Sequence, residues 1–315
     1  MLVDRRMLLG GAMAVPLSAS AAGAQAAPAR IALWAGPPPG ATSPPPRFHA
    51  ELRRSHDKPE TWLTGIAVPA IEIYRPMRSN GVGLLSIPGG GYAFLAITNE
   101  GSEVARVFTA LGYTVAVLTY RLPAEGWRDR ADVPLQDAQR AMRVFRAMSA
   151  RLGLTSIGIA GFSARGHLAA SLATGHDEDV YTPADAADRL SARPDFAALI
   201  YPVTTLVLPD THAGSREHLL GTAPGKAEVA RRSPVLHVDA RTPPSFLLHA
   251  LDDDIVPVAC SLAWLAACRA AAVPVEAHLI EAGGHGFGVG LPTGNSGALW
   301  PEQCHRWIRR HTTRV

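Results

Sequence analysis

The sequence predicts an α/β fold in which a mostly parallel central sheet is covered by helices on both faces. Short apolar runs of strand length alternate along the chain with longer segments of helical periodicity. Strands that alternate with helices form parallel sheets, because each helix carries the chain back to the start of the next strand. The 315 residues, 47% of them hydrophobic, are enough for one large core. Disordered and fibrous proteins are excluded by the same composition.

The regular pattern begins at Ile66. Residues 27–65 precede it, and Gly36–Pro46 contains six prolines in eleven positions, which predicts an extended segment outside the sheet. The α/β domain is therefore predicted to cover residues 66–315, as a single domain.

The predicted strands are apolar runs bounded by turn residues. In chain order they are Val82–Ile87, Tyr113–Thr119, Ile157–Gly161, Phe196–Tyr201, Phe246–Ala250 and Val275–Ile280. The predicted helices are Ser102–Leu111, Pro134 to about Leu152, a helix from about Ala164, Val258–Ala272 and Pro301–Arg310. Residues 203–241 lack a clean period and lie between two core strands, so they are predicted to form a small excursion over one end of the sheet.

Residues 1–26 are interpreted as a twin-arginine-type signal peptide. Arg5 and Arg6 open an apolar stretch, and Ala24-Gln25-Ala26 supplies the small residues that a signal peptidase needs. A membrane anchor is the alternative, but the stretch is short and is interrupted by Pro16. We therefore expect cleavage near Ala26 and a periplasmic or secreted mature chain that has no membrane contact after cleavage.

Charge and motif content exclude several partners. The 30 basic and 27 acidic residues give a net charge of +3, and the basic residues are scattered, which argues against nucleic acid as a partner. The sequence lacks the H-E-x-x-H motif and any clustered Cys/His spacing, which predicts neither a metal nor an organic cofactor. The oligomeric state is not indicated by any sequence feature.

The three cysteines do not form a disulfide framework. Cys260 and Cys268 stand eight positions apart in a predicted helix, so about 12 Å of helical rise separates them, too far for a bond. Small buried thiols are the favoured interpretation, and a pair between Cys304 and one of the other two is the alternative.

The clearest chemical signal is a serine between a predicted strand and a predicted helix. Ser163 lies in the segment Gly161-Phe162-Ser163-Ala164-Arg165-Gly166-His167. A sharp turn of this kind raises the hydroxyl above the sheet, and the backbone N–H groups at the helix N-terminus face developing negative charge. A capping serine is the alternative interpretation.

Three further segments supply the partners that such a serine needs. Pro88-Gly89-Gly90-Gly91-Tyr92 leaves a strand with backbone donors that no side chains obstruct. Acids follow the strand that ends at Ala250, and His285 follows the next strand. Because the carboxyl ends of parallel strands share one edge of a sheet, the serine, acid and imidazole are predicted to converge there. An imidazole oriented by a carboxylate is the base that activates a serine.

With these motifs, the sequence resembles the acetyl esterase and acetylxylan esterase-like branch of the α/β-hydrolases. Members of that branch carry a PGGGY loop, a GFSAGGH turn, an HAxDDxxVP loop and a GGHGF loop, and the resemblance spans nearly the whole mature chain. It implies the α/β-hydrolase fold and a Ser-His-Asp triad. In that triad Ser163 is the nucleophile, His285 the general base and Asp253 the orienting acid.

The resemblance also implies the substrate and the remaining site residues. The expected substrates are short acyl esters, acetylated carbohydrates such as xylan first among them. The tetrahedral oxyanion is expected on the N–H groups of Gly90, Gly91 and Ala164. Tyr92 is placed in the acyl or alcohol pocket, with a packing role as the alternative.

The sequence departs from the family pattern at Arg165, where the GFSAGGH turn of the family has glycine. A guanidinium at this position is expected to clash, to push the helix outward, or to point into the site opening, where it would contact a substrate carboxylate. This departure keeps open a catalytically impaired α/β-hydrolase-fold binding protein. A short-peptide serine peptidase is the other alternative, because prolyl-peptidase domains share the order of the triad residues.

Several nearby polar residues receive structural interpretations. Asp252 and Asp254 are solvated loop acids, or replace Asp253 if the loop register shifts by one. His167 is expected to satisfy a backbone group inside its helix. Asp137 and Arg140 stand at i and i+3 on a predicted helix, where an ion pair that ties the helix to its neighbours is expected. Arg216 is given a structural role, with substrate contact as its alternative.

Overall fold

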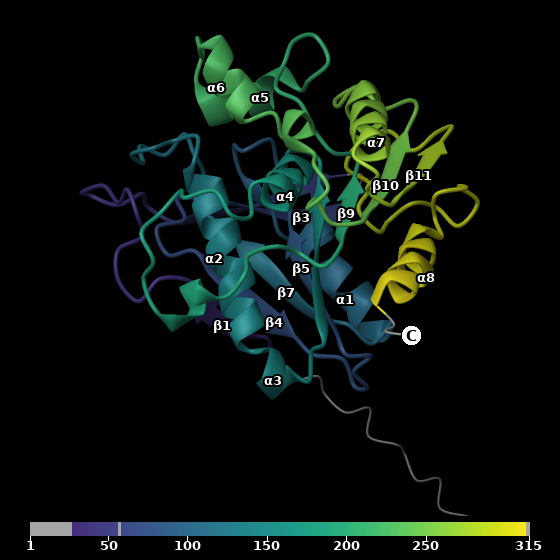
Figure 1. Ribbon diagram of the computed structural model, residues 1–315, viewed down its shortest axis with the longest axis horizontal. Coiled ribbons are helices and arrows are strands. Elements are labelled where there is room, and N and C mark those ends of the chain that lie inside the picture. Colours follow the sequence, from purple (N-terminus) through teal and green to yellow (C-terminus); the bar gives the residue numbers. More distant parts are fainter. Residues whose placement is uncertain (1–26, 56–57, 313–315) are drawn as a thin grey trace, which may run out of the picture.

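An eight-stranded sheet forms the centre of the protein (Figure 1), which we describe from a computed structural model. The structure describes residues 27–55 and 58–312. The predicted signal peptide, residues 1–26, lies outside the described residues. Within the described ranges, no helix has both the length and the apolar character needed to traverse a bilayer.

The order of the strands in the sheet is β1-β4-β7-β5-β8-β9-β10-β11. Pairing is parallel from β7 to β11, whereas β4 pairs antiparallel with both β1 and β7. The strands are β1 (Ala29–Ala32), β4 (Ala70–Tyr74), β5 (Val82–Ile87), β7 (Thr114–Thr119), β8 (Ser156–Phe162), β9 (Ala197–Ile200), β10 (Ser245–Ala250) and β11 (Val275–Ile280). The carboxyl ends of β8, β10 and β11 therefore lie at the same edge of the sheet.

Helices cover both faces of the sheet (Figure 1). One face packs against α1 (Glu103–Ala110) and α8 (Trp300–Thr312). The other packs against α2 (Val133–Ala147), α3 (Ser149–Leu152), α4 (Ala164–Thr174) and α7 (Ala259–Ala270). The strands between the two helical layers are apolar on both sides, and β5, β7, β8, β9 and β10 are buried throughout.

Two smaller units flank this core. A second sheet pairs β2 (His49–Ser55), β3 (Lys58–Thr64) and β6 (Leu95–Ala96), all antiparallel. The excursion between β9 and β10 contains α5 (Ala213–Leu220) and α6 (Lys226–Arg231), which lie together at the top of the view in Figure 1. The short turns η1 (Thr98–Ser102), η2 (Ala186–Arg189) and η3 (Pro234–His237) complete the described elements.

The predicted fold class is confirmed, and the structure differs from the sequence-based expectation in the N-terminal segment. The segment 27–65 is extended, but it supplies edge strand β1 of the central sheet and both strands of the β2–β3 hairpin. All three cysteines are free and buried, which agrees with the interpretation as small buried thiols, and Cys304 forms no disulfide.

Asp137 and Arg140 tie α2 to its neighbours through ion pairs, as expected, but they do not pair with each other. Asp137 lies on the buried face of α2, where its carboxylate pairs with Arg121 at 2.8 Å, both side chains being fully buried. Arg140 instead pairs with Asp188 at 3.1 Å and with Asp185. Both residues therefore bind α2 to other parts of the chain.

Candidate active site

Ser163 stands at the sharp turn between β8 and α4. Its φ of +58° is unusual for a residue with a side chain, and it marks a strained backbone held by its surroundings. The Ser163 N–H donates to the Ile200 carbonyl at 3.1 Å, which fixes the turn to β9.

Two glycines allow this turn to pack tightly. A Cβ on Gly161 would lie 2.3 Å from the Arg165 carbonyl oxygen, and a Cβ on Gly166 would lie 2.5 Å from the Pro202 side chain. The close approaches in the turn are therefore made at positions 161 and 166. Position 165 is not one of them, so a side chain fits there.

The structure brings the three predicted triad residues together in one hydrogen-bonded chain. The Ser163 hydroxyl lies 2.7 Å from His285 Nε2, and His285 Nδ1 lies 2.7 Å from Asp253 Oδ2. Asp253 follows β10 and His285 follows β11, so the convergence results from the parallel strand ends. In this arrangement the Nδ1–H of the neutral imidazole donates to the carboxylate, and Nε2 accepts from the serine hydroxyl.

Asp253 is fully buried and strongly hydrogen-bonded. Burial opposes its ionisation, but hydrogen bonds from His249, His285 and the Val256 N–H together hold the pKa of the Asp253 carboxyl well below its usual value. The Ile255 N–H and Val256 N–H donate to Oδ1 at 3.0 and 2.8 Å. The carboxylate therefore stays ionised and immobile beside the imidazole.

The neighbouring acids have separate places. Asp252 Oδ1 accepts hydrogen bonds from the N–H groups of Gly283 and Gly284, at 2.9 and 2.8 Å, so it holds the loop that carries His285. Asp254 is exposed. The register of the loop is thus the one in which Asp253 reaches the histidine.

The glycine loop after β5 runs along the same opening. Gly90 and Gly91 line the cleft that contains Ser163, and both have positive φ values, +127° and +61°. Among the described residues, the N–H groups of Gly90, Gly91 and Ala164 donate to no protein acceptor. Unpaired backbone donors beside a serine hydroxyl are the arrangement that binds an oxyanion.

A buried carboxylate that sequence reasoning did not single out supports this loop. Glu100, 4% exposed, lies in η1; its Oε2 accepts from the Gly89 N–H at 2.6 Å and its Oε1 from the Tyr201 hydroxyl at 2.7 Å. A Cβ on Gly89 would lie 2.0 Å from Oε2, so the glycine makes room for the acid. Burial raises the pKa of the Glu100 carboxyl.

Tyr201 extends this support to the histidine loop. Its hydroxyl accepts from the Gly288 N–H at 2.9 Å, and its ring meets the His285 ring edge to face at 4.9 Å between centroids. Asn99, next to Glu100, donates to the Gly286 carbonyl at 2.8 Å. The short turn η1 thus connects the glycine loop to the histidine loop. The only sequence signal for it is an acid followed by a glycine shortly after the glycine loop.

The cleft at the triad has a volume of about 370 Å³. Apolar lining comes from Trp62 and from the loop after Gly91, which includes Phe94. Two imidazoles line it from the excursion, His212 and His218. This volume and lining suit a small organic substrate.

Tyr92 and Arg165 do not lie where their predicted substrate contacts require. Tyr92 is 1% exposed and its hydroxyl bonds to His167 Nδ1 at 2.8 Å, so it packs beneath the loop. Arg165 is also fully buried; its guanidinium donates to the Phe94 carbonyl and lies 5.2 Å from the ring centroids of both Tyr92 and Tyr120. Because the close contacts of the turn are at Gly161 and Gly166, the arginine neither displaces the helix nor enters the cleft.

The remaining polar residues have structural contacts. His167 Nε2 bonds to the Arg232 carbonyl at 2.7 Å, as the helix-interior interpretation expected. Arg216 is not among the residues that line the cleft. In the described part of the chain, no group of three or more His, Cys, Asp or Glu side chains is arranged to hold a metal ion. The lack of a cofactor stays a prediction.

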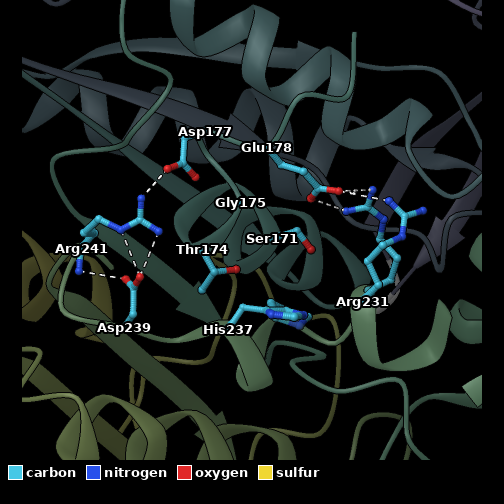
Figure 2. A pocket seen from close by; sticks show the side chains of 11 residues that line it. Ser171, Thr174, Gly175, Asp177, Glu178, Arg231, His237, Asp239 and Arg241 are labelled. Atoms are coloured by element: carbon cyan, nitrogen blue, oxygen red, sulfur yellow. Dashed lines mark hydrogen bonds and ion pairs between the residues drawn. The ribbon is translucent and has the colours of Figure 1, made fainter. Parts of the chain in front are cut away.

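A second cavity, of about 350 Å³, lies between α4 and the excursion (Figure 2). Its arginines are paired with acids: Arg231 with Glu178 at 3.1 Å, and Arg241 with Asp239 at 3.1 Å and with Asp177. The paired charges make this cavity a poor site for an anion, and it holds no part of the triad.

Comparison with known proteins identifies the family. A model of the BD-FAE family matches residues 71–266, more than half of the chain. The chain belongs to the BD-FAE family. This BD-FAE protein also has the α/β-hydrolase fold of its structural neighbours, which confirms the predicted resemblance.

Two curated relatives illustrate the family. The chain is 34% identical over 208 residues to endo-1,4-beta-xylanase B of Butyrivibrio fibrisolvens, covering 65% of this chain and 32% of the relative. It is 30% identical over 223 residues to an acetylxylan esterase of Xylanibacter ruminicola, covering 69% of this chain and 43% of the relative. The BD-FAE chain thus spans less than half the length of these curated relatives.

A solved structure aligns over most of both chains. The acetyl ester-xyloside bifunctional hydrolase of Caldicellulosiruptor lactoaceticus is 32% identical, with a TM-score of 0.73, and the alignment covers 90% of this chain and 96% of that one. The likeness at this identity extends the shared fold to nearly all of the described residues.

Proposed function

We propose that this BD-FAE protein is a serine esterase that hydrolyses short-chain acyl esters, acetyl esters of carbohydrates such as xylan above all. The observation that carries the proposal is the continuous series of hydrogen bonds from Asp253 through His285 to the Ser163 hydroxyl, each 2.7 Å long, beside the cleft. The names of the relatives, an acetylxylan esterase and a xylanase among them, support the carbohydrate ester as substrate.

The geometry supports a two-step reaction. Ser163 Oγ attacks the ester carbonyl while its proton passes to His285 Nε2, and Asp253 stabilises the imidazolium that forms. The negative charge on the carbonyl oxygen is received by the N–H groups of Gly90, Gly91 and Ala164. His285 then gives the proton to the leaving alcohol, which departs and leaves an acyl-enzyme. Water, deprotonated by the same imidazole, attacks the acyl-enzyme; the bond from the acyl carbon to Ser163 Oγ breaks, Oγ takes the proton back from His285, and the acid is released.

The catalytic proposal is favoured over a non-catalytic binding protein by the position of Arg165. Its side chain lies beneath the glycine loop, away from the Ser163 hydroxyl, so it blocks neither the nucleophile nor the N–H donors. A peptidase would share the triad, but the names of the relatives, a xylanase and an acetylxylan esterase, favour a carbohydrate ester over a peptide.

The test is the loss of ester hydrolysis in Ser163→Ala. Removing a triad residue lowers turnover by about 10⁴-fold or more, so the variant should retain almost no activity on p-nitrophenyl acetate. Ser79→Ala, a change at an exposed serine outside the cleft, is the matched control and should behave as the parent does. The parent, but not Ser163→Ala, should react with a fluorophosphonate. Equal hydrolysis by Ser163→Ala and the parent would refute the nucleophile assignment.

Substrate range is tested by a rate series over acetyl, butyryl and octanoyl esters, together with acetylated xylan. A preference for acetyl is expected, and faster hydrolysis of octanoyl esters would overturn the short-acyl proposal. We also propose that the protein is exported and cleaved near Ala26. The N-terminal sequence of the mature protein tests this, and an intact Met1 in periplasmic extracts would contradict it.

A further inference from the structure

We propose that His212 and His218 form a hydroxyl-binding pair for the alcohol part of the ester, which makes the enzyme selective for esters of polyhydroxylated alcohols, that is, of sugars. The proposal rests on the proposed esterase function and assigns the substrate contacts that determine its specificity. Both side chains project from the segment around α5, and both line the cleft that contains Ser163.

The backbone fixes the tautomer of His212. His212 is the N-cap of α5, and its Nδ1 accepts from the Ser215 N–H at 3.3 Å and lies 2.7 Å from the Ser215 hydroxyl. A backbone N–H can only donate, so Nδ1 carries no proton and, in the neutral ring, Nε2 carries it. Within the described residues, Nε2 has no protein hydrogen-bond partner. His212 therefore offers an N–H donor to the cleft.

The backbone fixes the opposite tautomer for His218. Its Nδ1 lies 2.9 Å from the Gly91 carbonyl oxygen. A carbonyl can only accept, so Nδ1 carries the proton and Nε2 of the neutral ring has a free lone pair. Nε2 of His218 likewise has no partner among the described residues. His218 therefore offers an acceptor where His212 offers a donor.

The two imidazoles lie close to the reacting groups. His218 contacts the glycine loop directly at Gly91, and a Cβ built on Gly91 would lie 3.7 Å from His212 Cε1. Burial, with the nearby His285 and His218, lowers the pKa of His212, which favours its neutral form. A group held at the oxyanion donors is therefore within reach of α5.

A donor and an acceptor that line one cleft match a hydroxyl group, which is both. An acetyl methyl can use neither of them, and the apolar lining from Trp62 and Phe94 suits the acyl group better. The alcohol side of the ester is thus the part that the histidines recognise. A simple alkyl alcohol would leave both nitrogens without partners in a partly enclosed site, which lowers its relative affinity.

The experiment compares two esters of the same ring size. Monoacetylated methyl β-xylopyranoside carries free hydroxyls, whereas cyclohexyl acetate carries none. The quantity measured is the ratio of kcat/KM for the xyloside to kcat/KM for cyclohexyl acetate. The parent enzyme should favour the xyloside.

Substitution of each histidine by asparagine or by glutamine distinguishes a substrate-binding role from a purely structural one. Asparagine places its amide where Nδ1 stood, so His212→Asn keeps the helix cap and His218→Asn keeps the bond to Gly91, and both lose the nitrogen that faces the cleft. Glutamine does the reverse and restores a polar group at the Nε2 position. Each asparagine variant should lower the ratio by about three- to tenfold, mainly through KM, since one net hydrogen bond is lost. Each glutamine variant should recover most of it.

Opposite results would overturn the proposal. If the asparagine variants keep the parental ratio and the glutamine variants lose it, the imidazoles only brace α5 and the glycine loop. Binding measured in a Ser163→Ala background separates this failure from failure of the esterase function. There, His212→Asn should weaken calorimetric binding of the acetylated xyloside by about three- to tenfold. Unchanged binding refutes the hydroxyl-binding pair. If the parent does not hydrolyse the ester but His212→Asn still weakens binding of the acetylated xyloside, only the proposed esterase function is refuted.

Discussion

Replacing Arg165 by methionine or by glycine distinguishes the contribution of its charge from the contribution of its volume. The guanidinium donates to the Phe94 carbonyl and lies over two aromatic rings, those of Tyr92 and Tyr120. Its Nε and Nη1 atoms, however, are buried without a partner among the described residues. Methionine keeps the length of the side chain and removes the charge, whereas glycine removes both.

The energies on the two sides nearly cancel for the charge. A hydrogen bond from a charged donor contributes about 1.5–3 kcal/mol, and each desolvated cation–π contact contributes about 1–2 kcal/mol. Against this, two unsatisfied buried donors cost about 1–3 kcal/mol each, before the cost of burying the charge itself. Arg165→Met should therefore change the free energy of unfolding by no more than about 2 kcal/mol.

Glycine should be considerably worse. Emptying the space of a large buried side chain costs about 3–5 kcal/mol, and glycine inside a helix adds about 1 kcal/mol. Urea denaturation followed by circular dichroism measures both variants. If Arg165→Met lost as much stability as Arg165→Gly, the charge would be the stabilising element and this reasoning would be wrong.

Activity adds a second measurement. Both variants lose the bond to Phe94 and with it part of the support of the glycine loop, so kcat on p-nitrophenyl acetate should fall, by roughly tenfold for one lost charged hydrogen bond. A large gain in rate with Arg165→Gly would mean that the arginine impairs the site, contrary to its buried position.

Three further results are expected. Asp253→Asn should reduce kcat by about 10⁴-fold, because the imidazole loses the partner that holds its tautomer. Asp252→Asn keeps a carbonyl acceptor for the histidine loop and should lower kcat by less than about tenfold, and Asp254→Asn, at an exposed position, should alter kcat by no more than about twofold. The reverse ranking would reassign the acid. Glu100→Ala leaves the Gly89 N–H and the Tyr201 hydroxyl without their acceptor, so the free energy of unfolding should fall by about 2–5 kcal/mol, and Glu100→Gln should partly restore it. An unchanged free energy of unfolding in the alanine variant would contradict the role of the buried acid. The pKa of Asp253 is lowered in the folded protein, so the stability that the ionised carboxylate contributes is present above its unfolded pKa of about 4 and is lost as pH falls below that value. The free energy of unfolding, measured from pH 7 to pH 3, should therefore differ less between the parent and Asp253→Asn as the pH falls. A constant difference would refute the linkage.

The core of the fold was predictable because its strands and helices have strong periodicity. The predicted ranges Val82–Ile87 and Val275–Ile280 coincide with β5 and β11. The β2–β3 hairpin was not predictable in this way, because β2 is largely polar and exposed and β3 is only partly buried, so no alternation of apolar residues marks either strand. Residues 203–241 form two short helices without a continuous apolar face, which is why no period was visible there.

The candidate site was predictable as far as topology determines it. Ser163, Asp253 and His285 each follow a strand of one parallel sheet, and such strand ends converge whatever the details of packing. The directions of side chains were not determined in this way. The positions of Tyr92 and Arg165 depend on which neighbours enclose them, and these come from elements distant in the sequence.

The excursion between β9 and β10 leaves and rejoins the sheet at adjacent strands. Nothing in the register of those two strands depends on how long the intervening chain is or which side chains it presents. Changes in this insert can therefore alter the substrate preference while the strands that carry the nucleophile, base and acid keep their places. The insert also holds the Gly91 carbonyl through His218, so an engineered replacement must supply that contact if the glycine loop is to keep its position.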